Sequence, residues 1–147
     1  MDSLLRYLPQ HDGLLPKWLL FVSLVSVLNS VQAYVSLKPT QKVYCGPAPA
    51  KAATPAAATS PVTPLSARTF GTWTLLSSVI RLYAAYHISN PQVYELAFWS
   101  YGVAWVHFFT EWLVFGSTRM GAGLAGPVVV ASSSLYWMWS QWGYYVK

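Results

Sequence analysis

Four long apolar stretches, separated by short polar or proline-rich segments, constrain this sequence more than any other feature. A helix that crosses a membrane needs about 20 mostly apolar residues, because a rise of about 1.5 Å per residue must cover about 30 Å of hydrocarbon. The stretches at 18–37, 70–88, 93–115 and 124–146 meet that requirement. Only 9% of the residues are Asp, Glu, Lys or Arg, against about 25% in a typical soluble domain. The sequence therefore predicts an all-α integral membrane protein, a four-helix bundle with four transmembrane helices.

The segments between these stretches predict the domain organisation. Residues 1–17 form an N-terminal segment that we expect to lie at the membrane interface. Residues 38–69 form a basic linker, and its 46–64 part holds five Pro and seven Ala, a composition typical of a flexible connection. Only residues 89–92 join the second and third stretches, which predicts an antiparallel helical hairpin. Pro127 is expected in the first turn of the fourth helix, where its missing N–H costs little.

The basic residues predict an orientation in the membrane. Four spans place both termini on one side and the first and third loops on the other. Those two loops carry Lys38, Lys42, Lys51, Arg68 and Arg119, and the opposite side carries Arg6, Lys17 and Lys147. Positive charge favours the cytosolic side of a membrane. Five basic residues in the loops against three on the opposite side therefore predict that the loops face the cytosol and the termini face the lumen.

Small and polar residues recur at helical spacing along each stretch. In lipid, helices associate through close packing of small residues and through polar contacts. The stripes are Ser23, Ser26, Asn29, Ser30 and Ala33; Gly71, Thr74, Ser78, Arg81 and Ala85; Ser100, Ala104, His107 and Glu111; and Ser132, Ser133, Ser134 and Gln141. We expect these stripes to face one another inside the bundle.

Four polar side chains within the apolar stretches are the candidate site residues: Arg81, Glu95, His107 and Glu111. Charges inside a membrane are expensive, usually paired and frequently functional. We expect Arg81 to form an ion pair with Glu95 or Glu111 across the hairpin. His107 and Glu111 stand four residues apart and so share a helix face. The set predicts polar contacts between helices or with a partner protein.

The sequence holds none of the motifs that would predict a catalytic, cofactor or metal site. Three His and one Cys are too few for a histidine-rich di-iron site or a thiolate metal cage. GAGLAG (121–126) matches the letters G-x-G-x-x-G, but it is a short loop before a predicted membrane helix and not a strand-to-helix turn, so it predicts no nucleotide-binding site. There is no G-x-S-x-G. The basic residues form no stripe that would bind nucleic acid.

Two other functions remain open from the residues alone. A small membrane sterol isomerase or sterol-binding protein could use His107 and Glu111 as acid and base. The intramembrane charges also permit a subunit of an ion or proton pathway, although no repeat or discontinuous-helix pattern supports that function.

Three long segments carry a resemblance to a known family. They are ARTFGTWTLLSSVIRLYAAYHI (67–88), YELAFWSYGVAWVHFFTEWLVFG (94–116) and GPVVVASSSLYWMWSQWGYYV (126–146). Together with NSVQAY (29–34) in the first stretch, they closely resemble the family of ergosterol biosynthetic protein 28, and the likeness covers most of the chain. The 46–64 stretch departs from the shorter loop of that family, so it inherits no role.

The resemblance implies a multi-pass protein of the endoplasmic reticulum membrane without catalytic activity. It implies a scaffold that tethers the sterol C-4 methyl oxidase, the C-3 sterol dehydrogenase/C-4 decarboxylase, the 3-keto sterol reductase and further enzymes of ergosterol biosynthesis. The family has no catalytic motif to carry over, and its partners are these enzymes and membrane lipid. Tethering would raise the effective concentration of successive enzymes.

Overall fold

The computed structural model describes residues 6–47 and 59–146, and all regular structure in these ranges is helical. The helices are α2 (Leu15–Val35), α3 (Lys38–Val43), α5 (Pro64–Tyr86), α6 (Pro91–Leu113), α7 (Ala122–Ser140) and α8 (Trp142–Tyr145). The first part of the predicted interfacial segment and most of the Ala/Pro-rich stretch lie outside the described residues.

Capping residues set where the two central helices begin. Thr63 and Ser66 form a reciprocal capping box at the start of α5, and Asn90 accepts a hydrogen bond from the Val93 amide at the start of α6. Each cap is followed directly by a proline, whose missing N–H costs nothing in the first helical turn. The caps extend α5 and α6 beyond the predicted apolar stretches, to Pro64 and Pro91.

The fourth predicted stretch forms two helices, because α7 ends at Ser140 and the short α8 follows Gln141. The position predicted for Pro127 is wrong. The small residues of 122–126 are already helical, so Pro127 lies in the second turn of α7 and inside the helix. A proline there removes one backbone hydrogen bond to the residue four positions earlier.

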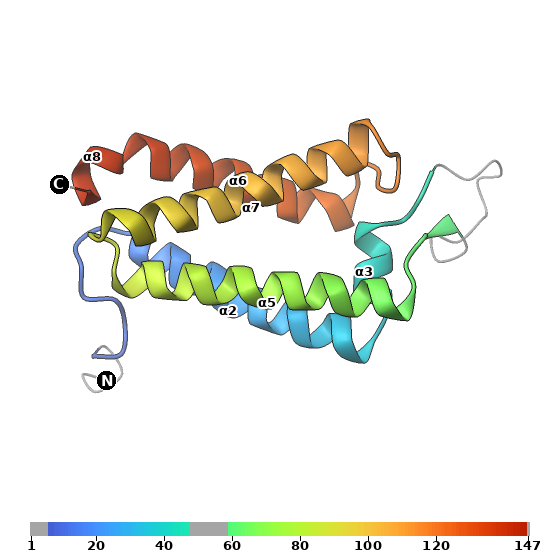
Figure 1. The fold of residues 1–147 in the computed structure, drawn as a ribbon, viewed down its shortest axis with the longest axis horizontal. Helices are drawn as coiled ribbons and strands as arrows, with labels where there is room; N and C mark the ends of the chain where they lie inside the picture. Colours follow the sequence, from blue (N-terminus) through green and yellow to red (C-terminus); the bar gives the residue numbers. More distant parts are fainter. Residues whose placement is uncertain (1–5, 48–58, 147) are drawn as a thin grey trace.

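The four long helices are arranged as two pairs (Figure 1). Helix α2 runs along α5, α6 runs along α7, and α3 lies across one end of the bundle. The start of α2 and the end of α8 lie together at the opposite end, which we call the terminal end. The rings of His11 and Tyr145, whose centroids are 5.3 Å apart, join the N- and C-terminal segments there.

The seam between α2 and α5 is built from small and hydroxyl-bearing residues. Ser23 donates a hydrogen bond to the Ser78 carbonyl, and Ser30 donates one to the Gly71 carbonyl, both at 2.7 Å. A Cβ atom added to Gly71 would lie 3.1 Å from the Cβ of Ala33. The predicted stripes of these two helices therefore do face each other, whereas Asn29 of the first stripe is exposed.

The apolar core is concentrated at the terminal end. Its buried members are Leu15, Leu19, Val22, Ala84, Ala85, Ile88, Tyr94, Ala97, Tyr101, Met138 and Tyr145. A smaller cluster of Ala104, Phe108 and Leu124 lies toward α3. The two helix pairs are thus joined tightly at one end, and the cavities described below lie toward the other.

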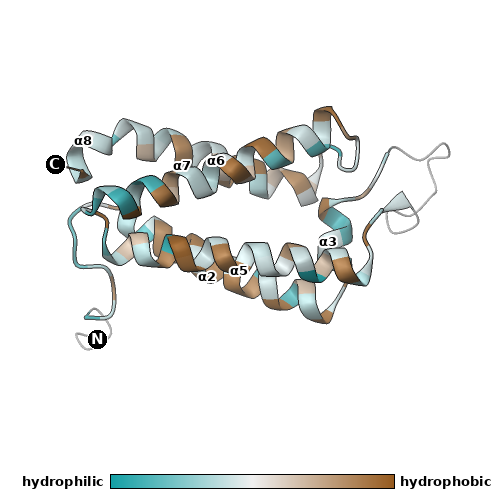
Figure 2. Cartoon of the chain, in the orientation of Figure 1, coloured by the Kyte–Doolittle hydropathy of each residue, from teal (hydrophilic) through white to brown (hydrophobic). Residues whose placement is uncertain are grey.

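Large apolar side chains cover the outside of the bundle. Phe21, Leu28, Leu76, Trp99, Val129 and Trp139 are all exposed and come from all four long helices. Hydrophilic residues gather at α3 and at the start of α6 (Figure 2). Among the described residues, α2 is the one helix that is long and apolar enough to cross a membrane by length and composition. Helix α5 carries more hydroxyl-bearing residues than α2 and two arginines, α6 carries two glutamates and a histidine, and α7 carries glycines, serines and tryptophans, which lowers their hydropathy.

Candidate functional site

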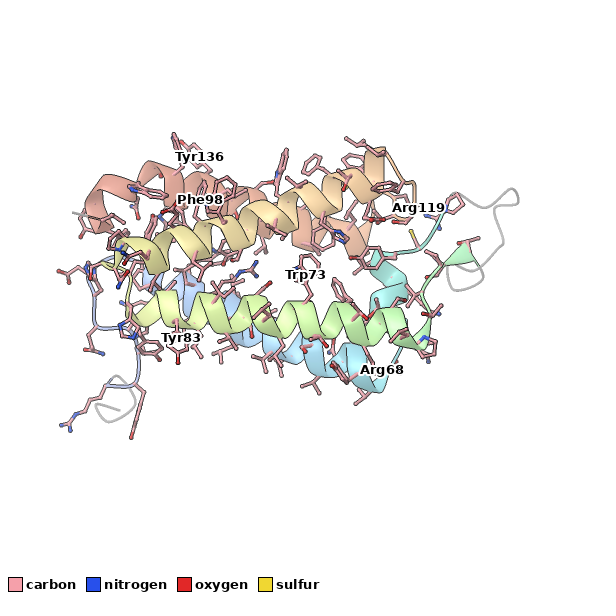
Figure 3. All side chains as sticks on the ribbon, in the orientation of Figure 1. Arg68, Trp73, Tyr83, Phe98, Arg119 and Tyr136 are labelled. Carbon is pink, nitrogen blue, oxygen red and sulfur yellow. The ribbon has the colours of Figure 1, made fainter. Side chains whose placement is uncertain are left out.

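His107 lies at the centre of an aromatic cluster at the α3 end. Its Nε2 atom is 2.6 Å from the hydroxyl of Tyr44, which directly follows α3. The ring of Trp73 meets the imidazole edge-on, with centroids 5.0 Å apart, and Phe70 meets Tyr44 in the same way at 5.5 Å. Figure 3 shows Trp73 pointing from α5 into the space between the helix pairs. The cluster joins α3, α5 and α6.

The carboxylate of Glu111 is oriented by the loop that follows α6. The hydroxyl of Ser117 donates to its Oε2 atom. Burial, and secondarily the nearby charge of Glu111, raise the pKa of Tyr44 above its ordinary value. Tyr44 therefore stays protonated and can donate its hydrogen bond to His107.

His107 and Glu111 line one large cavity of about 680 Å³. The other lining residues are mostly apolar or aromatic and come from α3, the segment before α5, α5 itself and α6. Thr40 also lines it, and its buried hydroxyl has no hydrogen-bond partner. The volume falls within the range of about 300–1,000 Å³ that is usual for small-molecule sites.

The predicted ion pair of Arg81 is wrong. The guanidinium instead donates from Nε to the Ser100 hydroxyl at 3.2 Å and from Nη2 to the Ser100 carbonyl at 3.3 Å. Its Cζ atom lies 3.9 Å from the centroid of the Tyr101 ring. In the antiparallel hairpin, Ser100 is level with Arg81, whereas Glu111 lies about 16 Å further along α6 at 1.5 Å per residue.

Glu95, the fourth candidate, lies near the start of α6 and is exposed. Its carboxylate forms no ion pair with any residue of the described ranges. Glu95 was expected within reach of Arg81 because few residues separate the two along the hairpin. It lies on a different face of α6 from Ser100, and Arg81 meets Ser100 instead.

A second cavity, of about 260 Å³, lies beside Arg81 between the two helix pairs. Phe70 and Trp73 line both cavities. Ser26 of α2, Ser77 of α5 and Tyr101 of α6 also line the second cavity. We call it the Arg81 cavity.

The sequence did not predict several residues of these sites. Tyr44 is 63 positions from His107, and no local pattern links the two. Ser77, by contrast, stands one helical turn before Arg81 and so shares its face, which is a signal that the sequence does carry. No group of three His, Cys, Asp or Glu side chains that could hold a metal ion occurs within 6–47 and 59–146.

The fold and the sites together define a class of protein: a helical bundle with an apolar exterior and with polar groups gathered between its helices. Residues 15–136 match the family model described as Erg28 like protein. The chain belongs to this family.

Named relatives match nearly the whole chain. It is 46% identical over 146 residues to ergosterol biosynthetic protein 28 of Candida albicans, covering 99% of this chain and 96% of the relative. It is 49% identical to the protein of that name in Saccharomyces cerevisiae, covering 90% of this chain and 83% of the relative. The human homolog is 35% identical, covering 86% and 83%. No solved structure is significantly similar to the chain.

Proposed function

We propose that this chain is a non-catalytic scaffold of ergosterol biosynthesis in the endoplasmic reticulum membrane. It tethers the sterol C-4 methyl oxidase, the C-3 sterol dehydrogenase/C-4 decarboxylase and the 3-keto sterol reductase, so that successive enzymes meet at a raised effective concentration. The observation that carries the proposal is the near full-length similarity to relatives named ergosterol biosynthetic protein 28.

The distribution of polar groups supports a multi-pass arrangement, in which α2, α5, α6 and α7 each cross the membrane. Large apolar side chains lie outside, whereas Ser23, Ser30, Ser78 and Arg81 are buried between helices. A soluble protein of this size does not normally expose so continuous an apolar surface. Helices that meet through small residues and hydroxyl groups are typical of membrane bundles.

Co-purification tests the scaffold. The tagged chain is isolated from gently solubilised membranes, and its partners are identified by mass spectrometry against an unrelated multi-pass protein of the same membrane. We expect all three enzymes to be enriched, and deletion of the chain to slow C-4 demethylation while each isolated enzyme stays active. Recovery of none of the three enzymes would overturn the proposal.

The large cavity favours one alternative, a sterol isomerase or sterol-binding protein, because His107 and Glu111 both line it. An acid and a base facing an apolar cavity could move a proton on a bound sterol. Purified chain that converts a sterol, and loses this activity in His107→Ala and Glu111→Gln, would establish the alternative. The scaffold predicts no conversion by the purified chain.

A further inference from the structure

The guanidinium of Arg81 is buried without an acidic partner. The side chain is 7% exposed, and its hydrogen bonds go to the hydroxyl and carbonyl of Ser100. Of the four acidic residues in the chain, Glu111 is bonded to Ser117, Glu95 and Asp12 are exposed, and Asp2 lies outside the described ranges. The described part of the chain therefore supplies no carboxylate to this charge.

The Arg81 cavity holds further polar groups that are free to bind. Ser77 stands one turn before Arg81 on the same face of α5, and Ser26 faces it from α2. Both serines are buried, and neither hydroxyl has a hydrogen-bond partner among the described residues. A guanidinium has five N–H donors, of which the contacts with Ser100 use two. Several donors are thus left for a ligand in this cavity.

An unpaired buried charge is costly, and the surroundings of Arg81 offset only part of that cost. The face of Tyr101 and the oxygens of Ser100 stabilise the cation, but neither carries negative charge. Buried cations are normally paired with an anion. The planar fork of arginine fits the two oxygens of a carboxylate especially well. The cavity is therefore suited to an acid that comes from outside the chain.

The shape of the cavity restricts what that acid can be. On α5 the lining runs from Phe70 to Arg81, about 16 Å along the helix at 1.5 Å per residue. Apart from its few polar groups, the wall is apolar and aromatic. Val22 and Tyr101, two members of the packed core of the terminal end, also line the cavity. A phospholipid would bring a bulky polar headgroup that these walls cannot solvate. The volume of about 260 Å³ takes a carboxylate and the adjoining part of an elongated apolar body, and the rest of that body extends out of the cavity between the helix pairs.

We infer that the Arg81 cavity binds an elongated, apolar carboxylic acid, with its carboxylate against Arg81 and Ser77 and its body along Phe70 and Trp73. The identity of this acid rests on the proposed function. Oxidation of a C-4 methyl group supplies a sterol carboxylic acid, and a C-4 decarboxylase consumes one. The acid is then a C-4 carboxysterol, which the chain would hold after the methyl oxidase has produced it and before the decarboxylase consumes it.

Binding to the purified full-length chain tests the inference. The probes are cholesteryl hemisuccinate, which joins a sterol body to a carboxylate, uncharged cholesterol, and dioleoyl phosphatidic acid as an anionic phospholipid. Isothermal titration calorimetry of the protein in detergent micelles measures the affinity for each probe. We expect cholesteryl hemisuccinate to bind about 10- to 100-fold more tightly than cholesterol, the difference that hydrogen bonds to a charged group support.

Substitutions locate the binding. Arg81→Gln should remove the preference for the acid, and Ser77→Ala should weaken acid binding about 2- to 10-fold. Arg68→Gln on the exposed part of α5 is the matched control and should bind like the unmodified chain. If Arg81→Gln does not fold, Arg81→Lys, which keeps the charge and loses the fork, should show a reduced preference.

The inference is overturned by equal affinity for acid and cholesterol, by a preference that survives in Arg81→Gln, or by phosphatidic acid binding as tightly as cholesteryl hemisuccinate. Arg81 could instead bind a carboxylate of a partner enzyme. In that case Arg81→Gln would lose the co-purified enzymes, the unmodified chain would show no preference for the acid, and the inference would be overturned. Enzymes that co-purify with a chain that binds no acid would leave the scaffold standing. If the chain binds the acid but no enzyme co-purifies with it, the proposed scaffold function is refuted and the binding of an acid in the Arg81 cavity is not.

Discussion

At the residue scale, Gly71 sets how closely α2 and α5 approach. A Cβ atom at this position would lie 2.9 Å from the ring of Tyr34 and 3.1 Å from the Cβ of Ala33. The Gly71 carbonyl also accepts the hydrogen bond of Ser30. Because Ala33 has no flexible end that can move aside, a larger side chain at 71 must separate the helices.

We expect Gly71→Leu to lower the free energy of unfolding by about 1–3 kcal/mol, the usual cost of overpacking. Unfolding of the purified protein in mixed micelles measures the change. Gly143→Leu is the matched control, since nothing lies within 4 Å of a Cβ at that position. Equal stability of the two variants would contradict the close seam.

A second prediction concerns the hydrogen bond between Tyr44 and His107. Tyr44→Phe should cost about 0.5–1.5 kcal/mol of stability, the net value of a typical hydrogen bond. The double-mutant cycle with His107→Phe should give a coupling energy of at least about 0.5 kcal/mol. Tyr136→Phe, which changes an exposed side chain, is the control and should have no effect. Additive effects in the cycle would show that the two rings do not interact.

These residues show what the sequence could predict of the site. The small stripes of α2 and α5 follow from helical spacing alone, and the structure confirms their contact through Ser30 and Gly71. The partner of Arg81 was predicted wrongly, because the composition made a glutamate the natural partner. In the fold, Ser100 is level with Arg81 and accepts its hydrogen bond, whereas Glu111 lies too far along α6 and Glu95 is on another face. Pairings across long sequence separations, such as Tyr44 with His107, depend on tertiary packing that no local pattern records.

At the scale of elements, α3 is held against α7 through a glycine. A Cβ atom at Gly123 would lie 2.0 Å from the carbonyl oxygen of Lys42, so the backbones are in direct contact there. Thr118 also donates to the Val43 carbonyl at 2.6 Å, and the Gly46 amide donates to the Ser117 carbonyl at 2.8 Å. These contacts position α3 and Tyr44 beside the large cavity.

We therefore expect Gly123→Ala to detach α3 from α7. A methyl group cannot fit within 2.0 Å of a backbone oxygen, and backbone atoms cannot move aside as a side chain does. Hydrogen–deuterium exchange over residues 38–46 should become faster, while exchange in α2 and α5 stays the same. Gly121→Ala is the control, because its Cβ would meet nothing closer than 4.0 Å. Unchanged exchange in Gly123→Ala would rule out this contact.

The ends of the elements were harder to predict than the elements themselves. Hydropathy locates an apolar stretch, but a helix begins where a side chain can satisfy its first amides. Thr63 and Asn90 do so outside the apolar stretches. Helix α7 begins at Ala122 without a side-chain cap. The small residues there do not indicate in the sequence where the helix begins. That is why Pro127 was expected one turn too close to the helix start.

At the scale of the whole molecule, basic residues are separated between the two ends of the bundle. Lys38, Lys42, Arg68 and Arg119 lie at the α3 end, whereas Arg6 and Lys17 lie at the terminal end. Figure 3 shows Arg68 and Arg119 at the same end of the bundle. If the bundle spans the membrane as proposed, this distribution places the α3 end in the cytosol.

Single cysteines at the two ends of α6 test that orientation. In a Cys45→Ser background, Met120→Cys places a thiol in the loop before α7, and Ser89→Cys places one in the turn before α6; both positions are exposed. A membrane-impermeant maleimide added to sealed microsomes, whose outer face is cytosolic, should label position 120 and reach position 89 only after detergent is added. Labelling of 89 alone would reverse the orientation. Labelling of both without detergent would mean that α6 does not cross the membrane, because its ends would then face the same side.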